Sequence, residues 1–420
     1  MRIPTNQQPT GSASAPPRAG LSRRSFLGAA GIGAAGFAAV GLGALAPTAS
    51  QAFGLRPAPA AQAAGGTLPV TIVNASGSYA TSNVWVHVVG TNLTTNVQGH
   101  VEPNGTFVPA STGDNGADGT AAYGVPLSEA GTVNLPVDGL SGRIYLSLGQ
   151  RLPFRVVDTA GGPGIVHPAG WVDSDPSFGI LHDFFEFTWQ NGAMYCNSTQ
   201  VDMFSVPISI ALQGQGSQTV GAVRSGGRAS FFDTMRNTDG FAGLVVGDTR
   251  VIAPSHGIES GRFSANYLDG YIADAWNAYT GRDLTVDANG QTYQLRTNGS
   301  TLTATQGGAQ KASFQLPSTQ DVLFCNGNLS APNDGVSGPI AAVLGAALNR
   351  TTMRDFATQP TTDPSTFYRQ PQTNHYAGAL HDIHTDGKSY GFAFDDVAGF
   401  ASYIQDGAAT SVTLTIEALS

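Results

Sequence analysis

Short hydrophobic runs separated by turn residues dominate the chain from residue 68 to about residue 154. Val84, Val86 and Val88 alternate with other side chains, and comparable runs lie at residues 70–73 and 142–148. Asn-Gly, Asp-Gly and Gly-Gly steps divide these runs, as they commonly divide the strands of antiparallel sheets. The pattern predicts a sandwich or barrel of antiparallel strands.

The hydrophobic periodicity becomes helical after Ile210, and hairpin-like strand patterns lie between the helical segments. The chain returns to strand patterns near its end. Helices are expected at residues 228–236, 267–279 and 339–353, and strands at residues 283–286, 291–296, 301–305, 390–394 and 411–417.

These patterns predict a mainly β protein with an α+β part. Residues 64–213 and 365–420 would form the β-sandwich or barrel domain, and residues 214–364 a mixed α/β domain inserted into it. A wide groove between the two would be the natural place for a substrate.

The first 63 residues are predicted to be an export leader. Residues 22–28, Ser-Arg-Arg-Ser-Phe-Leu-Gly, form a twin-arginine signature, and an apolar run at residues 29–46 follows. Small residues near Ala52 and Ala63 offer cleavage sites. A membrane anchor is the alternative, but the run is rich in glycine and only weakly apolar. We expect a secreted protein without a membrane-bound segment.

The net charge of the chain is −9, and removal of the five arginines in residues 1–63, with no acid, changes it to −14. This acidity argues against nucleic acid or an anionic membrane as a partner, because both need clustered Lys and Arg. A neutral substrate fits better. Cys196 and Cys325 could form one disulfide in an exported protein, although the spacing does not show that they are close.

The most informative stretch is residues 178–210, where Glu186 and Asp202 lie within apolar, strand-like runs. Alternation along a strand puts Glu186 and Thr188 on one face, and Phe185, Phe187 and Trp189 on the other. A carboxylate among aromatic side chains loses hydration, so it must hold its proton or find a partner. Glu186 is therefore a candidate general acid.

The relation between the two acids depends on the register of the predicted hairpin. A loop centred on Met194 would set Glu186 directly opposite Asp202, with Gln200, Asp202, Phe204 and Val206 on one face of the second strand. Two carboxyl groups so placed could flank a glycosidic bond and leave room for the water of an inverting hydrolysis. A tight turn at Asn191-Gly192 is the alternative, and it would shift the two acids out of register.

The surroundings of the two acids indicate different catalytic roles for them. Glu186 should hold its proton, whereas Asp202, beside Gln200 and the polar residues 197–199, should find hydrogen-bond donors and act as general base. Thr188 could hydrogen-bond the acid or a sugar hydroxyl. Tyr195 and Trp189 could stack on sugar rings, although Trp189 could equally be a core residue. A structural role for both acids is the competing interpretation.

The same residues resemble glycoside hydrolase family 64, the laminaripentaose-producing β-1,3-glucanases. The resemblance rests on residues 185–188, Phe-Glu-Phe-Thr, on residues 199–204, Thr-Gln-Val-Asp-Met-Phe, with Pro207, and on the sixteen-residue interval between the acids. It implies that Glu186 is the general acid and Asp202 the general base of an inverting reaction that needs no cofactor. Residues 389–396 are similar to the ends of thaumatin-like proteins, to which this family is related, and residues 373–376 resemble the tail of the family itself.

The resemblance implies a thaumatin-like β domain, an inserted α/β domain, and a protein that binds β-1,3-glucan and releases short oligosaccharides such as laminaripentaose. We expect a monomer. Asp395 and Asp396 would be groove-lining or turn acids. Thaumatin-like proteins are usually rich in cysteine, so their disulfide scaffold does not carry over to this chain. A non-catalytic glucan-binding or antifungal protein is the alternative function, but such a protein would not need both acids.

A cluster near the C-terminus suggests a metal site at first sight, because His375, His381 and His384 lie close to Asp382 and Asp386. The spacing fits no standard zinc motif, and the segment looks like a loop. We therefore expect no metal.

Overall fold

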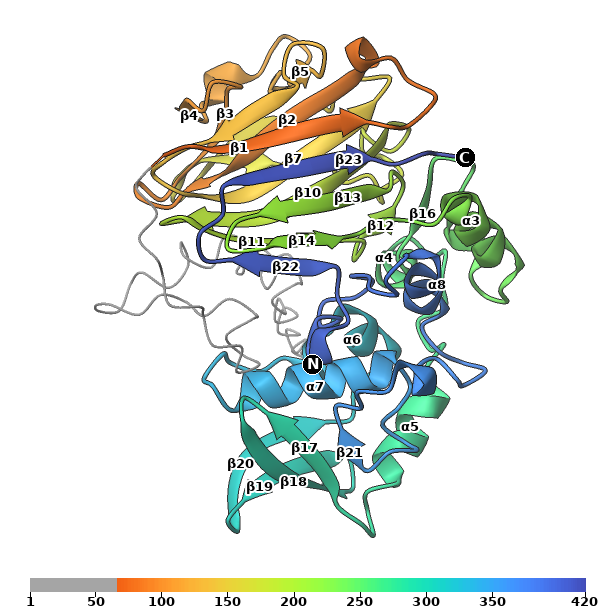
Figure 1. Cartoon of the computed structure of the whole chain (residues 1–420). Coiled ribbons are helices and arrows are strands. Elements are labelled where there is room, and N and C mark those ends of the chain that lie inside the picture. The colour runs from red at the N-terminus through yellow and green to blue at the C-terminus, as the bar shows by residue number, and fades with distance from the viewer. Residues whose placement is uncertain (1–65) are drawn as a thin grey trace, which may run out of the picture.

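The computed structural model describes residues 66–420, so the leader predicted for residues 1–63 lies outside the described residues. One end of the molecule is built from two sheets that enclose a common core, and the other from a smaller sheet flanked by helices (Figure 1). The first sheet has the order β14-β13-β23-β1-β6. Its strands are β1 (Leu68–Asn74), β6 (Thr132–Leu135), β13 (Ile208–Gln213), β14 (Ser217–Val220) and β23 (Ser411–Ile416).

The second sheet has the order β22-β11-β10-β7-β2-β3-β4, with β5 paired to β2. Its strands are β2 (Val84–Asn92), β3 (Val97–Val101), β4 (Phe107–Pro109), β5 (Val125–Pro126), β7 (Leu140–Leu148), β10 (Leu181–Gln190), β11 (Ala193–Ser198) and β22 (Tyr403–Asp406). Both sheets contribute to one buried core, for example Val70 and Leu414 from the first and Leu146 and Phe187 from the second. The prediction of an antiparallel β part is confirmed, with one parallel pair, β1 with β23.

The other face of the second sheet is partly covered by the hairpin of β8 (Arg155–Thr159) and β9 (Gly162–Val166). Phe154, Val156 and Ile165 pack there against Val89 and Tyr145 of the sheet. A small sheet of β12 (Met203–Phe204), β15 (Val245–Val246) and β16 (Arg250–Ile252) then leads toward the helical part. The rest of this face carries the candidate site.

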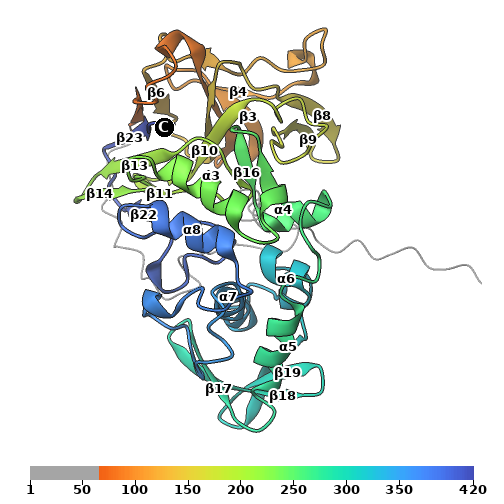
Figure 2. The ribbon, with the colours of Figure 1, turned by 90° about the vertical axis from the view of Figure 1, so that its right-hand side faces the viewer.

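The helical part contains α3 beside α8 and the long α7 above the smaller sheet (Figure 2). The helices are α3 (Gly227–Asn237), α4 (Pro254–Glu259), α5 (Asp269–Asn277), α6 (Thr319–Phe324), α7 (Ser337–Asn349) and α8 (His375–Ile383). The sheet strands are β17 (Leu284–Ala288), β18 (Gln291–Asn298), β19 (Thr301–Gln306), β20 (Ala309–Gln315) and β21 (Thr358–Gln359). Single 3₁₀ turns are η1 (Thr81–Asn83), η2 (Thr112–Asp114), η3 (Ala242–Leu244), η4 (Gly327–Leu329), η5 (Pro364–Thr366) and η6 (Val397–Gly399).

Two expectations for the C-terminal region are wrong. The histidine-rich segment is the helix α8, capped by the Asn374 side chain, which accepts a hydrogen bond from Ala377 N at 3.1 Å. The strand expected at residues 390–394 is instead a series of turns that ends in η6. Tyr376 and Phe392 are buried in the core of the helical part, so the chain rejoins the sandwich at β22 rather than at residue 365.

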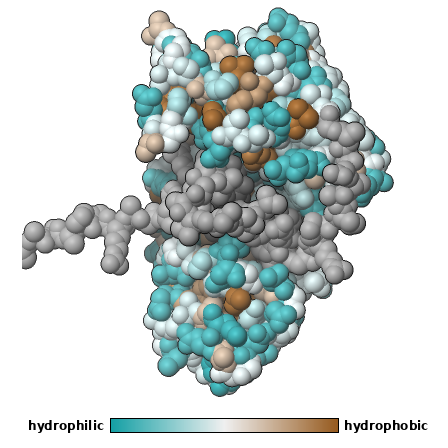
Figure 3. Space-filling view, turned by 90° about the vertical axis from the view of Figure 1, so that its left-hand side faces the viewer, coloured by the Kyte–Doolittle hydropathy of each residue, from teal (hydrophilic) through white to brown (hydrophobic). Residues whose placement is uncertain are grey.

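The coloured part of the surface in Figure 3 is mostly polar, and the hydrophobic residues visible there form small patches. In residues 66–420 no helix combines the length and the hydropathy needed to cross a membrane.

Candidate active site

Strand β10 lies near the middle of the second sheet and carries the first candidate acid. Phe185, Phe187 and Trp189 point into the core of the sandwich, whereas Glu186 and Thr188 are half-buried on the opposite face. The predicted alternation is therefore confirmed. It places Glu186 outside the main core, on the face that leads toward the helical part.

The hairpin between β10 and β11 has the tight turn, and the register centred on Met194 is wrong. Asn191 and Gly192 have φ values of 52° and 80°, which Asn and Gly adopt more readily than other residues. This turn pairs Glu186 with Asn197 and Thr188 with Tyr195. Glu186 and Asp202 are therefore not cross-strand neighbours.

Asp202 reaches the site by a different route, because β11 ends at Ser198 and residues 199–202 bend away from the sheet. The Gln200 N–H donates to the carbonyl of Tyr390, and the Asp202 carbonyl accepts from Ala253 N at 3.0 Å. The predicted common face of Gln200, Asp202, Phe204 and Val206 is consequently wrong. Asp202 lies at the junction of the two parts, with 8% of its surface exposed.

Arg143 on β7 is the partner of Glu186. Its Nε and Nη2 approach Oε1 of Glu186 at 2.9 and 2.6 Å, and its guanidinium lies 4.2 Å from the ring centre of Phe184. Burial opposes the charge of Arg143, yet Tyr145, Glu186 and Asp202 together raise its pKa above the usual value. The sequence argument expected apolar surroundings for Glu186, and the structure provides a guanidinium instead.

The charges of both acids also influence Tyr145. Burial raises the pKa of its hydroxyl, Arg143 opposes this, and the charges of Glu186 and Asp202 raise it further. The hydroxyl accepts from Arg143 Nη1 at 3.2 Å and is 3.0 Å from His167 Nδ1. The two candidate acids therefore act on the same Arg143–Tyr145 pair, although they are not opposite each other on neighbouring strands.

The Asp202 carboxylate has its own partner from α4. His256 Nε2 lies 2.9 Å from Oδ1 of Asp202, and His256 Nδ1 lies 2.7 Å from Oε2 of Glu259. Trp171 stacks on the imidazole, with ring centres 4.7 Å apart. None of these three partners was foreseen from the sequence, since α4 has only six residues and weak periodicity.

The candidate sugar-binding residues separate into two groups. Thr188 and Tyr195 are half-buried on the face of Glu186, and the Thr188 hydroxyl lies 3.1 Å from that of Ser141. Trp189 is 5% exposed, and its indole N–H donates to the Pro136 carbonyl at 3.1 Å. Trp189 is thus a core residue, and its expected role in stacking on sugars is wrong.

The two neighbouring acids near the C-terminus also differ. Asp395 has no exposed surface and binds Arg350 Nη2 at 3.1 Å and His381 Nε2 at 3.0 Å. It also accepts from Gly391 N, so it is a structural anchor and cannot line a groove. This interaction also affects His381. Burial lowers the pKa of its imidazole, but the charge of Asp395 and the hydrogen bond to it raise the pKa above the usual value.

Asp396 is half-buried, and burial raises its pKa to about 7. Its charge and that of Glu186 both contribute to the raised pKa of Tyr390, after the larger effect of burial. A role of Asp396 in substrate binding stays a prediction.

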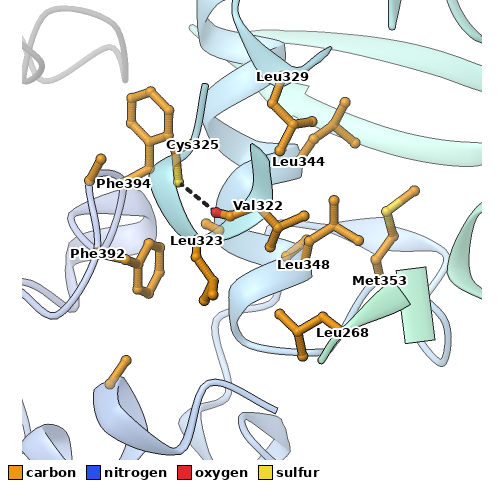
Figure 4. Close-up of a cluster of buried hydrophobic side chains, with 14 of the residues drawn as sticks. Leu268, Val322, Leu323, Cys325, Leu329, Leu344, Leu348, Met353, Phe392 and Phe394 are labelled. Atoms are coloured by element: carbon orange, nitrogen blue, oxygen red, sulfur yellow. Dashed lines mark hydrogen bonds between the residues drawn. The ribbon is translucent and has the colours of Figure 1, made fainter. Parts of the chain in front are cut away.

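The possible disulfide is absent from the described structure. Cys196 lies in the core of the sandwich, whereas Cys325 follows α6 in the core of the helical part. The Cys325 thiol donates to the Val322 carbonyl at 3.4 Å (Figure 4). Both side chains are buried in different cores, so they cannot meet without unfolding.

Within residues 66–420, no group of three or more His, Cys, Asp and Glu side chains is arranged to hold a metal ion. His381 is bound to Asp395, and His384 Nδ1 lies 2.7 Å from the Leu380 carbonyl.

Comparisons with known proteins identify the family of the chain. The family model of the β-1,3-glucanases of glycoside hydrolase family 64 matches residues 66–416. A glucan endo-1,3-beta-glucosidase of Cellulosimicrobium cellulans is 35% identical over 361 residues, which are 83% of this chain and 64% of that protein. The chain thus spans less than two thirds of that relative's length.

Two solved structures share the fold. One is a laminaripentaose-producing β-1,3-glucanase in complex with laminaritetraose, with 35% identity, a TM-score of 0.77, and coverage of 84% of this chain and 99% of that one. The other is a β-1,3-glucanase domain from Clostridium beijerinckii, with 28% identity, a TM-score of 0.77, and coverage of 86% and 100%. The chain belongs to glycoside hydrolase family 64, a family of β-1,3-glucanases.

Proposed function

We propose that this protein is exported and hydrolyses β-1,3-glucan with inversion, releasing short oligosaccharides such as laminaripentaose. Glu186 is the general acid and Asp202 the general base. The observation that carries the proposal is that Arg143, which binds Glu186 at 2.9 and 2.6 Å, is also influenced by the charge of Asp202, although the two acids come from different segments. Two carboxyl groups around one bound sugar are what glycoside hydrolysis requires.

The acid would work through Oε2 of Glu186. Arg143 holds Oε1, and within the described residues no hydrogen bond reaches Oε2. The held oxygen fixes the plane of the carboxyl group, so the other oxygen is the one that would deliver a proton to the leaving glycosidic oxygen. General acids must be held in this way within hydrogen-bond reach of the atom that they protonate.

The base would activate a water molecule on the opposite side of the sugar ring. As this water attacks the anomeric carbon, its proton passes to Asp202, and the bond to the leaving oxygen breaks with the proton from Glu186. One displacement of this kind inverts the anomeric configuration. Thr188 and Tyr195, on the face of Glu186, would contact the sugar through a hydroxyl and a flat ring, and Asp396 would add a polar contact.

The test is incubation of the purified protein with linear β-1,3-glucan, with the released oligosaccharides separated by size and their fresh anomeric form followed by NMR. A dominant short oligosaccharide that appears first as the α-anomer supports the proposal. Glu186→Gln and Asp202→Asn should each lower turnover by orders of magnitude and leave glucan binding largely intact. Binding without release by the unaltered protein would instead indicate a glucan-binding protein, and a β-anomer would refute inversion.

A further inference from the structure

Three side chains form a line that runs from the buried candidate base to the surface. Asp202 Oδ1, the two ring nitrogens of His256, and Glu259 Oε2 are joined by contacts of 2.9 and 2.7 Å. The side chains of Asp202 and His256 are 10% and 8% exposed, whereas that of Glu259 is 54% exposed. The imidazole is therefore enclosed, with a carboxylate at each of its nitrogens.

This geometry determines which protons the imidazole must carry. An ionised carboxylate only accepts hydrogen bonds, so a ring nitrogen at 2.7–2.9 Å from it must be a donor. When both carboxylates are ionised, both ring nitrogens carry protons, and His256 is an imidazolium. A neutral imidazole would turn a lone pair toward one of the two carboxylates.

The aromatic surroundings fit a positive charge on His256. The Trp171 ring lies parallel to the imidazole, with an angle of 22° between the planes, and an indole face attracts a cation. Phe324 of α6 stands nearly perpendicular to it, with ring centres 5.4 Å apart. The two rings limit the access of water, which strengthens the attraction between the imidazolium and both carboxylates.

The local backbone explains why α4 places these side chains together. Pro254 is the first residue of the helix, and Ala253 immediately before it donates its N–H to the Asp202 carbonyl. His256 and Glu259 are three residues apart, so they lie on the same side of the helix. The start of α4 is thus tied to the main chain of the same residue whose side chain it contacts.

We propose that His256, held in its charged form by Glu259, is a positioning residue that keeps Asp202 ionised and fixes the plane of its carboxylate. This inference rests on the proposed role of Asp202 as general base. A base must be ionised to accept a proton from water, and a neighbouring cation favours that state. Fixing one oxygen aims the carboxylate at the place where the attacking water must lie.

Other charged or titratable groups lie around these three side chains, and they limit how much activity is lost when His256 is replaced. Arg143 and Tyr145 of β7 interact electrostatically with Asp202. The charge of Glu186 on β10 also acts on these two side chains. From α6 the ring of Phe324 faces the imidazole, while Asp321 of that helix accepts from Ser318 N. Arg143 remains when His256 is replaced, so the loss should be partial.

The test compares His256→Gln and His256→Ala for kcat, KM and the pH dependence of kcat/KM on linear β-1,3-glucan. The glutamine can still donate to Asp202 but carries no charge, so the acidic limb of the pH profile should move up by about one pH unit. The alanine also loses the orienting bond, so kcat should fall about tenfold further at the optimum with little change in KM. His375→Gln is the matched control, because His375 is 3.1 Å from the Pro371 carbonyl and contacts neither acid.

A variant at an exposed position keeps the test valid if the His256 variants fail to fold. Glu259→Gln removes the outer carboxylate at an exposed position and should move the acidic limb in the same direction by a smaller amount. Glu129→Gln, also exposed, is its control. NMR of protein labelled with ¹⁵N-histidine gives a readout without substrate: both ring nitrogens of His256 should be protonated at neutral pH, and Glu259→Gln should lower the pH at which the proton is lost.

The outcomes separate this inference from the proposed function. If the unaltered protein cleaves glucan and Asp202→Asn abolishes cleavage, but His256→Gln and Glu259→Gln keep the original pH profile, His256 is only structural and the inference is overturned. A neutral His256 imidazole at pH 7 would overturn it as well. If the unaltered protein releases no oligosaccharide, both the proposed function and this inference fail.

Discussion

Asp183 on β10 offers a direct test of how burial affects the stability of this protein. The residue is 4% exposed, and its Oδ2 accepts from the N–H groups of Ser205 and Val206, each at 2.7 Å. Burial raises the pKa of this carboxyl from 3.8 to about 7, although the two hydrogen bonds and the nearby Arg250 and Arg228 act in the opposite direction. The acid thus connects β10 to the segment before β13 but is costly to ionise.

The sign of the effect on stability follows from this raised pKa. Between pH 3.8 and about 7 the folded protein retains a proton that the unfolded chain has released. The contribution of Asp183 to the free energy of unfolding therefore falls as the pH rises through this window. One pH unit is worth about 1.4 kcal/mol, so the loss across the window is about 4 kcal/mol.

Asp183→Asn removes this titration while an amide oxygen can still accept the two N–H groups. The variant should be less stable than the original protein at about pH 4, because the amide brings two N–H donors, where the protonated acid has one O–H, to a position at which Oδ1 has no partner among the described residues. This deficit should shrink, or reverse, by about 4 kcal/mol toward pH 7 to 8. The measurement is the free energy of unfolding from urea denaturation at a series of pH values.

The pH dependence must be compared between the variant and the original protein. Buried His87 and His182 have pKa values lowered to about 3, so they make the free energy of unfolding rise with pH, opposite to the effect of Asp183. Asp138→Asn, at an exposed position, is the control and should run parallel to the original protein. If the Asp183→Asn curve is also parallel to the original over the whole range, the carboxyl is not held protonated by burial and the reasoning is refuted.

Three other perturbations test the structural assignments. Trp189→Phe should lower the free energy of unfolding by about 1 kcal/mol, for the lost bond to Pro136, and leave the KM for glucan unchanged; a raised KM would restore the sugar-stacking role. Gly192→Ala should cost about 1 to 2 kcal/mol in urea denaturation because φ is positive there, and an unchanged stability would contradict the tight turn. Cys196 and Cys325 should both react with a thiol reagent in denaturant without prior reduction, and a disulfide would leave neither thiol reactive.

The sequence predicted features that depend on local periodicity. The alternation of β10, with Phe187 inside and Glu186 outside, is visible in the order of residues and is confirmed by burial. The helices α3, α5 and α7 lie within a few residues of their predicted positions. Helix α8 differs from the loop expected there, although Tyr376, Leu380 and Ile383 are spaced as on one helical face, because histidines near glycine are also common in turns.

Features that depend on long-range pairing could not be predicted in the same way. The two possible turns differ by only a few residues, yet they give different partners to Glu186, and only the tight turn at Asn191-Gly192 is found. Arg143 is 43 residues from Glu186, and His256 is 54 residues from Asp202. The chemistry of both acids depends on these partners, so composition near the acids is a poor guide to their environment.

The order of strands in the first sheet has a consequence for biosynthesis. β23, the last strand of the chain, lies in the middle of that sheet, between β1 and β13. A nascent chain that has not yet released residues 411–416 from the ribosome has two unpaired strand edges where β23 will bind, and such edges invite aggregation or degradation. The sandwich can therefore close only after residues 411–416 have been synthesised, and their loss by proteolysis would remove the centre of the sheet rather than trim its border.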